Sequence, residues 1–376
     1  MSKVGFVISK SGTAGSAGVN RMVFNMLKDE FDMDQVSPET LHYHTLPIVG
    51  IMLNYFTLYA KRKDYKYIIA TTYAGLPFVE ENHLIEMFHG VDTAMIVAAN
   101  EAINHGKITN KVLRKWLKKT EGLFTETLDD LVPLEAVNRI VEKHCTDKAE
   151  HIIAVSSKVK EDLVSLFDAD PKKITVICNG IPDYWFKENG DFSDFGMICP
   201  TRIDYRVFTF LIKGQDRLLE IMSHLGNIQK YVFASYSKVV PDDFKKRISE
   251  IITQNGGADF IVGKQGEELK AMYKPGYVLL STSRTEACQL TLLEGMASKL
   301  IPVTYDVGVA GDVIRHGENG FIVKNEKEAI RIIKHLAKNP KERERIALNA
   351  YETAKKLFTF DKMIEEYRKT FKQILH

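Results

Sequence analysis

The chain has 376 residues, which is too many for one ordinary hydrophobic core and predicts two α/β domains. Its 51 basic and 49 acidic residues leave a net charge of +2, which excludes the strongly basic surface that binds long nucleic acids. The four cysteines stand far apart without a CxxC pair, which argues against a disulfide framework or a zinc site and predicts reduced thiols.

The N-terminal sequence MSKVGFVIS fits a buried strand, because it lacks the basic flank, long apolar run and cleavage site of a signal peptide. The longest apolar stretch, residues 46–60, is interrupted by Pro47, Gly50 and Asn54 and is too short to span a bilayer. We therefore expect a cytoplasmic protein, with any membrane contact peripheral to the inner face.

The first half of the chain alternates predicted strands with predicted helices. Short apolar runs indicate buried parallel strands at residues 4–8, 67–71, 152–155 and 174–178. Apolar residues at helical spacing indicate one helix after Gly18 and another from about Ser157.

The second half begins after the polar stretch 187–195 and repeats this alternation. Strands are predicted at residues 196–199, 230–234, 260–262, 278–281 and 300–303, with helices between them, for example at 216–225 and 266–273. Alternation in both halves predicts two doubly wound domains, residues 1–190 and 191–359. A C-terminal helix at about 360–376 has one apolar face and is expected to pack back on the first domain.

Two glutamates, Glu286 and Glu294, flank the predicted junction between strand 278–281 and a helix at 290–298. This places Glu286 in the loop beyond the carboxyl end of the strand, where open α/β sheets bind ligands, and Glu294 about one turn into the helix. A helix that starts near Leu290 points backbone N–H groups at the same place, which suits a diphosphate. Two carboxylates there can accept hydrogen bonds from sugar hydroxyls. The alternative is an ordinary strand–loop–helix with two surface glutamates.

The residues around these glutamates resemble the family-4-type retaining glycosyltransferases, with their E-x7-E motif. The matching residues are Ser283, Glu286, Leu292, Leu293, Glu294, Met296, Ala297, Pro302 and Val303. Further matching pieces are GVAGDVIRHGENGFIV at 308–323, HIIAVSSKVKEDL at 151–163, ITVICNGIP at 174–182 and FHG at 88–90. The resemblance implies a GT-B fold, in which two Rossmann-like doubly wound domains face a central cleft, and a nucleotide-sugar donor.

The resemblance also implies roles for individual residues at the donor. Glu286 contacts hydroxyls of the donor sugar and Glu294 binds the nucleotide ribose. This chain has Ala287 and Cys288 where the family usually has Phe-Gly, and Lys299 where a glycine is common, which leaves the identity of the donor sugar open. The remaining expected donor contacts are Cys288, Gln289 and Leu290 at the start of the helix, and Gly263 and Lys264 at the nucleotide base.

A departing nucleoside diphosphate gathers negative charge, so cations aimed at that charge are the main catalytic device available. The resembling family places an Arg after the first strand of the second domain and a Lys in a following K-G. Here these are Arg202 and Lys213, although residues 205–212 look partly inserted and Arg206 is an alternative to Arg202. The competing interpretation is that these charges are solvated on a loop. We expect no bound metal, because the sequence shows no cluster of acidic, His or Cys ligands.

Two features of the first half are assigned to the donor phosphates and to the acceptor side. The segment 10–21, KSGTAGSAGVNR, is a glycine-rich loop that resembles the family's phosphate-covering loop, with Gly15, Gly18 and Arg21 as candidates. A tight structural turn is an equal alternative. His89, in MFHG, is expected near the acceptor or the transferred sugar and not as the general base, whereas a lone histidine is more often structural.

The segment 107–119, KITNKVLRKWLKK, is basic with apolar residues interleaved. It is interpreted either as a solvated helix face or as an interfacial helix on anionic lipid, with Trp116 and Leu117 dipping into the membrane.

These observations predict an enzyme that transfers a hexose, with retention, from a UDP- or GDP-sugar to a glycan, lipid-linked or polyol acceptor. Such a reaction belongs to the synthesis of cell-surface polysaccharides or glycoconjugates. The alternative from another class is a catalytically silent GT-B subunit that binds a partner transferase or a glycan. A sugar-nucleotide epimerase fits the motifs less well, and a nicotinamide dehydrogenase lacks its glycine fingerprint.

Overall fold

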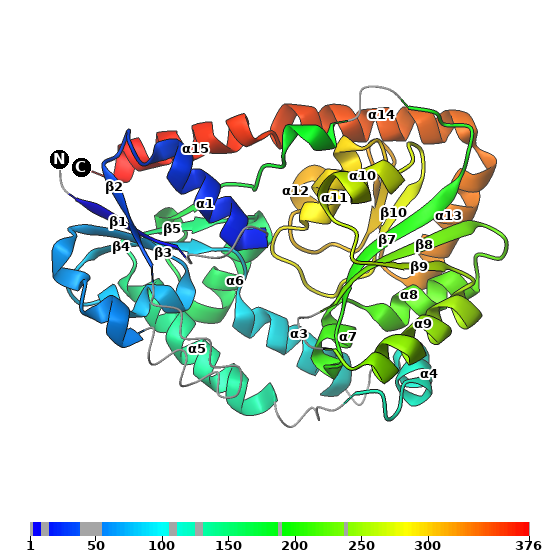
Figure 1. Cartoon of the computed structure of the whole chain (residues 1–376), viewed down its shortest axis with the longest axis horizontal. Coiled ribbons are helices and arrows are strands. Elements are labelled where there is room, and N and C mark those ends of the chain that lie inside the picture. Colours follow the sequence, from blue (N-terminus) through cyan, green and yellow to red (C-terminus); the bar gives the residue numbers. More distant parts are fainter. Residues whose placement is uncertain are drawn as a thin grey trace. The chain divides into compact units, whose positions relative to one another are not determined.

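The computed structural model describes residues 3–8, 15–37, 55–104, 111–124, 131–186, 190–236 and 240–375. It contains two six-stranded sheets, ordered β2-β1-β3-β4-β5-β6 and β12-β11-β10-β7-β8-β9 (Figure 1). Every strand pair in them is parallel. This confirms the predicted pair of doubly wound α/β domains.

The chain divides into two units that do not follow a single cut in the sequence. Unit 1 comprises Met1–Thr93, Glu135–Gly180 and Phe360–His376, and unit 2 comprises Ala94–Leu134 and Ile181–Thr359. The sequence places all of residues 1–190 in the first domain, whereas the structure groups residues 94–134 with the second.

Unit 1 is built on short strands, of which β1 and β3 are fully buried. These are β1 Val4–Val7, β2 Met33–Val36, β3 Tyr67–Ala70, β4 His83–Phe88, β5 His151–Ala154 and β6 Ile174–Val176. The long helices are α1 Gly15–Leu27, α5 Leu131–Lys148, α6 Ser157–Phe167 and α15 Phe360–Ile374, and α3 Asp92–Asn104 starts here and continues into unit 2. The C-terminal helix α15 lies along α1, and its Met363, Tyr367 and Phe371 join the core formed by the first strand.

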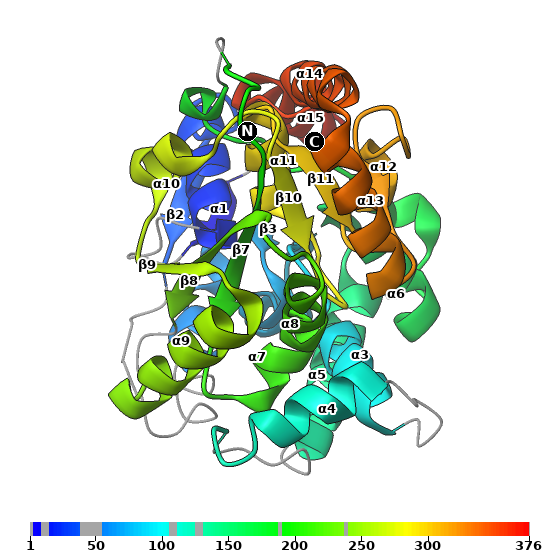
Figure 2. The same cartoon turned by 90° about the vertical axis from the view of Figure 1, so that its right-hand side faces the viewer.

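Unit 2 contains the second sheet and most of the remaining helices (Figure 2). Its strands are β7 Gly196–Ile203, β8 Gln229–Tyr236, β9 Asp259–Val262, β10 Val278–Ser281, β11 Ile301–Thr304 and β12 Phe321–Ile322. Its helices are α4 Lys111–Lys119, α7 Val207–Ile212, α8 Gln215–Ser223, α9 Asp242–Gly256, α10 Gly266–Met272, α11 Leu290–Ala297, α12 Ala310–Val313, α13 Glu326–Lys338 and α14 Pro340–Leu357.

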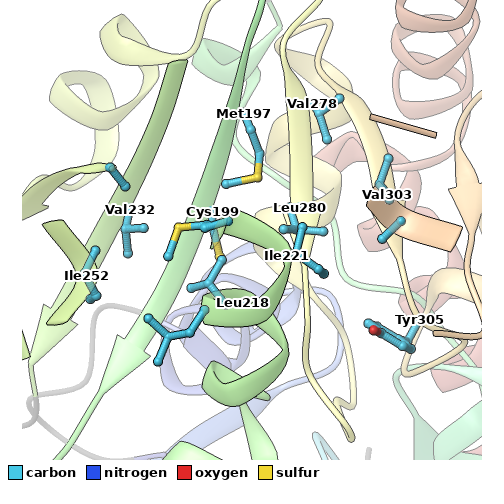
Figure 3. Packing of buried hydrophobic residues seen from close by; sticks show 14 of the residues in the cluster. Met197, Cys199, Leu218, Ile221, Val232, Ile252, Val278, Leu280, Val303 and Tyr305 are labelled. Carbon is cyan, nitrogen blue, oxygen red and sulfur yellow. The ribbon is translucent and has the colours of Figure 1, made fainter. Parts of the chain in front are cut away.

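The core of unit 2 lies between this sheet and the helices that follow its strands. Leu218 and Ile221 of α8 point toward Cys199 of β7 and Leu280 of β10 (Figure 3). These four side chains are at most 2% exposed. Because α8 follows the turn at Lys213, this packing fixes that turn against the loop that leaves β10.

Helix α4 belongs to unit 2 and packs on α8 through the residues that one of the two sequence interpretations placed in a membrane. Trp116 is 1% exposed and lies in the same core as Leu218, and Leu117 packs against that core. The indole Nε1 of Trp116 donates to Glu220 of α8 over 3.1 Å, and Lys115 Nζ donates to the same carboxylate oxygen over 2.7 Å. The interpretation in which Trp116 and Leu117 enter a bilayer is therefore wrong. A helix that faces a protein core and a helix that lies on a membrane both have one apolar face, so the sequence pattern alone does not distinguish them.

Two features are absent from the described part of the chain. No helix there is both long and apolar enough to cross a bilayer. Nor do three or more His, Cys, Asp or Glu side chains gather there in a way that could hold a metal ion.

Candidate functional site

The loop after β10 carries the first glutamate of the motif. β10 ends at Ser281 and lies between β11 and β7, and α11 begins at Leu290. The sequence predicts this strand–loop–helix with nearly the same bounds. Because the sheet is parallel, the loop lies at its carboxyl edge, where α/β proteins bind ligands.

Lys213 and Glu286 meet at this edge from segments that are distant in sequence. Lys213 Nζ donates to Glu286 Oε1 over 2.6 Å, and Ser283 Oγ donates to the same oxygen over 2.7 Å. The side chains of the ion pair are 23% and 20% exposed, so a ligand can reach both. The structure thus brings together the two residues that the sequence assigns to the phosphate and to the sugar.

The turn that carries Lys213 requires the glycine that follows it. The residues interpreted as an insertion form α7, which ends at Ile212, and Gly214 adopts a left-handed conformation with φ of +59°. A Cβ atom at Gly214 would lie 1.9 Å from the carbonyl oxygen of Thr282, so no other residue fits. Thr282 Oγ1 also donates to the Lys213 carbonyl over 3.0 Å.

A buried ion pair, Arg284 with Asp216, joins the same two segments. Arg284 donates through Nη1 and Nη2 to the two oxygens of Asp216 over 2.7 and 2.6 Å. The Arg284 side chain is 8% exposed and that of Asp216 is 0% exposed. Arg284 Nη1 also donates to the Leu211 carbonyl over 2.8 Å. The planar guanidinium thus holds the α7–α8 turn and the β10–α11 loop at fixed spacing. Nothing in the sequence indicates that Arg284 and Asp216 form a pair.

Arg202 and Arg206, the two candidates for the arginine at the diphosphate, differ in their surroundings. Arg206 donates through Nε and Nη2 to the fully buried carboxylate of Asp204 over 2.9 and 2.6 Å. Arg202 lies near the end of β7 with an exposed side chain. Releasing Arg206 to a phosphate would leave a buried carboxylate without its cation, so these contacts favour Arg202 as the phosphate ligand.

Glu294 lies on α11, where loss of water raises the pKa of its carboxyl group to about 7. Burial, reinforced by the charge of Glu294, also raises the pKa of two nearby phenols, Tyr184 and Tyr273. A Cβ at Gly266, the first residue of α10, would lie 3.7 Å from the Tyr184 hydroxyl. Sequence reasoning missed Tyr184, which comes from a single turn, Asp183–Trp185, that carries no motif.

The other residues predicted at the donor lie around the same edge. Gly263 follows β9 with φ of +81°, and Lys264 pairs with Glu268 over 3.3 Å. The Leu290 N–H donates to the Cys288 carbonyl over 2.9 Å, so this amide is engaged. Gln289 precedes α11, and its Oε1 is buried with no hydrogen-bond partner among the described residues.

The residues predicted in the first half lie in unit 1. Gly15 and Gly18 belong to helix α1, and not to a loop as the sequence predicts, while residues 10–14 lie outside the described residues. His89 follows β4, and its Nε2 lies 2.6 Å from Oδ1 of Asn20 on α1. Burial lowers the pKa of His89 to about 4. Asn20 is a contact that the sequence gave no reason to select.

Two family models match segments of this chain, and curated proteins resemble it over more than half of its length. Residues 209–353 match the family model for glycosyl transferases group 1, and residues 124–183 match that for glycosyltransferase family 4. An uncharacterised glycosyltransferase of Methanocaldococcus jannaschii is 23% identical over 237 residues, 62% of this chain and 62% of the relative. The O-antigen chain mannosyltransferase of Salmonella typhimurium is 21% identical over 208 residues, 54% of this chain and 55% of the relative. The chain thus spans less than two thirds of the length of these curated relatives.

The fold has a close counterpart among solved structures. The crystal structure of Anabaena HepE in complex with UDP-glucose superposes with a TM-score of 0.69 and 15% identity, covering 99% of this chain and 100% of that chain. At this identity the likeness shows the shared two-domain fold. It places no ligand in the present chain.

We predict that Arg284→Lys loosens the site by weakening its buried support. A lysine ammonium cannot form the two-pronged contact with Asp216 and also reach the Leu211 carbonyl. The free energy of unfolding should fall by about 1–3 kcal/mol, the scale for buried hydrogen-bonding groups left without a partner, as measured by urea denaturation. Arg345→Lys, at an exposed arginine of α14, is the matched control and should change it by at most about 0.5 kcal/mol. Equal stability of the two variants would contradict this role.

We predict that Glu294→Gln stabilises the fold at high pH. With a folded pKa of about 7 against an ordinary 4.5, folded Glu294 binds more protons than the unfolded chain between these values. The wild-type free energy of unfolding therefore falls as pH rises through that window, and the glutamine variant avoids the loss. The melting temperature of the variant minus that of the wild type should be more positive at pH 8 than at pH 5. Glu352→Gln, exposed on α14, should show no such trend.

Proposed function

We propose that the chain, which matches the models for glycosyl transferases group 1 and glycosyltransferase family 4, is a GT-B glycosyltransferase of the family-4 type. We propose that it transfers a hexose from a UDP- or GDP-sugar to a glycan, lipid-linked or polyol acceptor. In this reaction the bond from the sugar C1 to the diphosphate oxygen breaks and a bond from C1 to the acceptor oxygen forms. The proton of the acceptor hydroxyl passes to the leaving diphosphate. We propose further that the configuration at C1 is retained and that the product belongs to a cell-surface polysaccharide or glycoconjugate.

The contact between Lys213 and Glu286 is the observation that carries this proposal. An ammonium and a carboxylate, 2.6 Å apart and partly exposed, offer a donor for phosphate and an acceptor for sugar hydroxyls side by side. A sugar diphosphate carries phosphate oxygens, which accept hydrogen bonds, close to sugar hydroxyls, which donate them. The arrangement therefore fits the atoms on both sides of the bond that breaks.

Further charges and surfaces extend the site along the donor. Arg202 is proposed as the second cation at the diphosphate, so that two protein cations offset the charge that develops during transfer. Glu294 is proposed at the ribose, with Tyr184 beside it, and Gly263 and Lys264 at the base. We propose that transfer needs no bound metal, because Lys213 and Arg202 supply the positive charge. HepE is solved with UDP-glucose, which supports a UDP-sugar as the first donor to test.

We predict that Lys213→Ala removes about 2–4 kcal/mol of transition-state stabilisation, the scale for a lost preorganised donor. The measurements are the melting temperature with each of a panel of nucleotide sugars and the rate of donor hydrolysis, with Glu286→Gln as a second variant. The preferred donor should raise the wild-type melting temperature, and EDTA should leave the rate unchanged.

Lys334→Ala, at an exposed lysine of α13, is the control and should keep the wild-type rate. Near-wild-type turnover of Lys213→Ala would remove this lysine from the site. Absence of stabilisation by every nucleotide and nucleotide sugar would favour a silent binding subunit.

The exposed basic face of α4 is proposed as an electrostatic contact with anionic lipid. Arg114 and Lys118 are exposed, whereas Trp116 is committed to the core, so binding should depend on charge and not on insertion. We predict that Arg114→Glu with Lys118→Glu abolishes most sedimentation with anionic vesicles at low salt, while Lys327→Glu with Lys334→Glu on α13 does not. Failure of the wild type to sediment with these vesicles would remove the membrane from the proposal.

A further inference from the structure

The contact between His89 and Asn20 identifies which imidazole nitrogen carries a proton. His89 Nε2 lies 2.6 Å from Oδ1 of Asn20, and Asn20 is 5% exposed. An amide oxygen has no hydrogen to donate, so the hydrogen in this contact must belong to Nε2. The side chain of Asn20 thereby selects the Nε2–H form of the imidazole.

The second ring nitrogen, Nδ1, is then a hydrogen-bond acceptor that has no donor among the described residues. Burial lowers the pKa of His89 to about 4, so the ring is neutral near pH 7 and holds a single proton. With that proton on Nε2, Nδ1 presents a lone pair. Nδ1 is buried and has no hydrogen-bond partner among the residues that the structure describes. Buried polar atoms are rarely left in this state, and a ligand that donates a hydrogen would satisfy it.

The location of His89 indicates what such a ligand is. His89 follows β4 at the carboxyl edge of the first sheet, and Asn179 follows β6 at the same edge. Oδ1 of Asn179 is likewise buried without a partner in the described part of the chain. Two buried acceptor atoms at a ligand-binding edge, His89 Nδ1 and Asn179 Oδ1, favour a ligand that donates hydrogen bonds, and sugar hydroxyls do so.

We propose that Asn20 is a positioning residue that holds His89 in the Nε2–H form, so that Nδ1 accepts a hydrogen bond from a sugar hydroxyl. This inference rests on the proposed function, because the hydroxyl belongs to the transferred hexose or to the acceptor. His89 acts here as a neutral hydrogen-bond acceptor. Its role is to orient the sugar, and it takes no proton from it.

The tautomer is tested without any substrate. In ¹H–¹⁵N multiple-bond NMR spectra of the ¹⁵N-histidine-labelled chain at pH 8, the resonances absent from His89→Gln identify this ring. The wild type should show a proton on Nε2 and none on Nδ1. Asn20→Ala should expose the Nε2 proton to exchange with water and weaken its signal, and Asn20→Asp, which keeps the oxygen, should retain it. A wild-type proton on Nδ1 would overturn the proposal, whether or not the chain transfers sugar.

A double-mutant cycle tests the functional part. Asn20→Ala should lower kcat/KM about tenfold to a hundredfold, the scale for a misplaced orienting group, and Asn20→Asp should recover most of it. In the His89→Gln background Asn20→Ala should have no further effect. A changed donor KM would assign the hydroxyl to the transferred hexose, and a changed acceptor KM would assign it to the acceptor. Additive losses, or melting temperatures that fall in proportion to activity, would show a structural role for Asn20 and overturn the proposal.

Discussion

The buried contact between Arg284 and Asp216 is the constraint on which the site in unit 2 depends. Both groups are almost wholly removed from water, so their charges are stable there only while they face each other. One partner lies two residues before Glu286 and the other three residues after Lys213. The pair therefore sets the separation of the two segments, and Gly214 permits their backbones to approach. The geometry of the partly exposed Lys213–Glu286 contact therefore depends on the buried Arg284–Asp216 pair.

The Lys213–Glu286 contact has a consequence for catalysis. With no ligand bound, Lys213 and Glu286 neutralise each other's charge. The free-energy cost of holding both charged groups at the edge of the sheet is therefore low. A sugar diphosphate would draw the ammonium to phosphate and leave the carboxylate to sugar hydroxyls. Partners already in place need little reorganisation as charge develops on the leaving group. The neighbouring Glu294, whose pKa of about 7 reflects poor solvation, gains hydrogen-bond donors from a ribose in the same event.

The sequence was informative where local patterns decide structure. β10 and α11 were predicted to within about one residue, because a short apolar run and a helix of good helix formers leave few alternatives. β2 was missed, since only Met33 and Val36 of its residues are buried. The environment of Trp116 was misjudged because periodicity shows which face is apolar and not what covers it. The pairs Arg284–Asp216 and His89–Asn20 join residues 68 and 69 positions apart, and no spacing rule in a single sequence connects them.

A crystal structure of the chain with a nucleoside diphosphate, UDP and GDP in parallel, tests the central claim most directly. The account predicts diphosphate oxygens within hydrogen-bond distance of Lys213 Nζ, a ribose on Glu294, and a Lys213–Glu286 contact opened by the ligand while Arg284 stays on Asp216. A bound nucleotide that leaves Lys213 on Glu286 and takes its phosphate contacts elsewhere would contradict it.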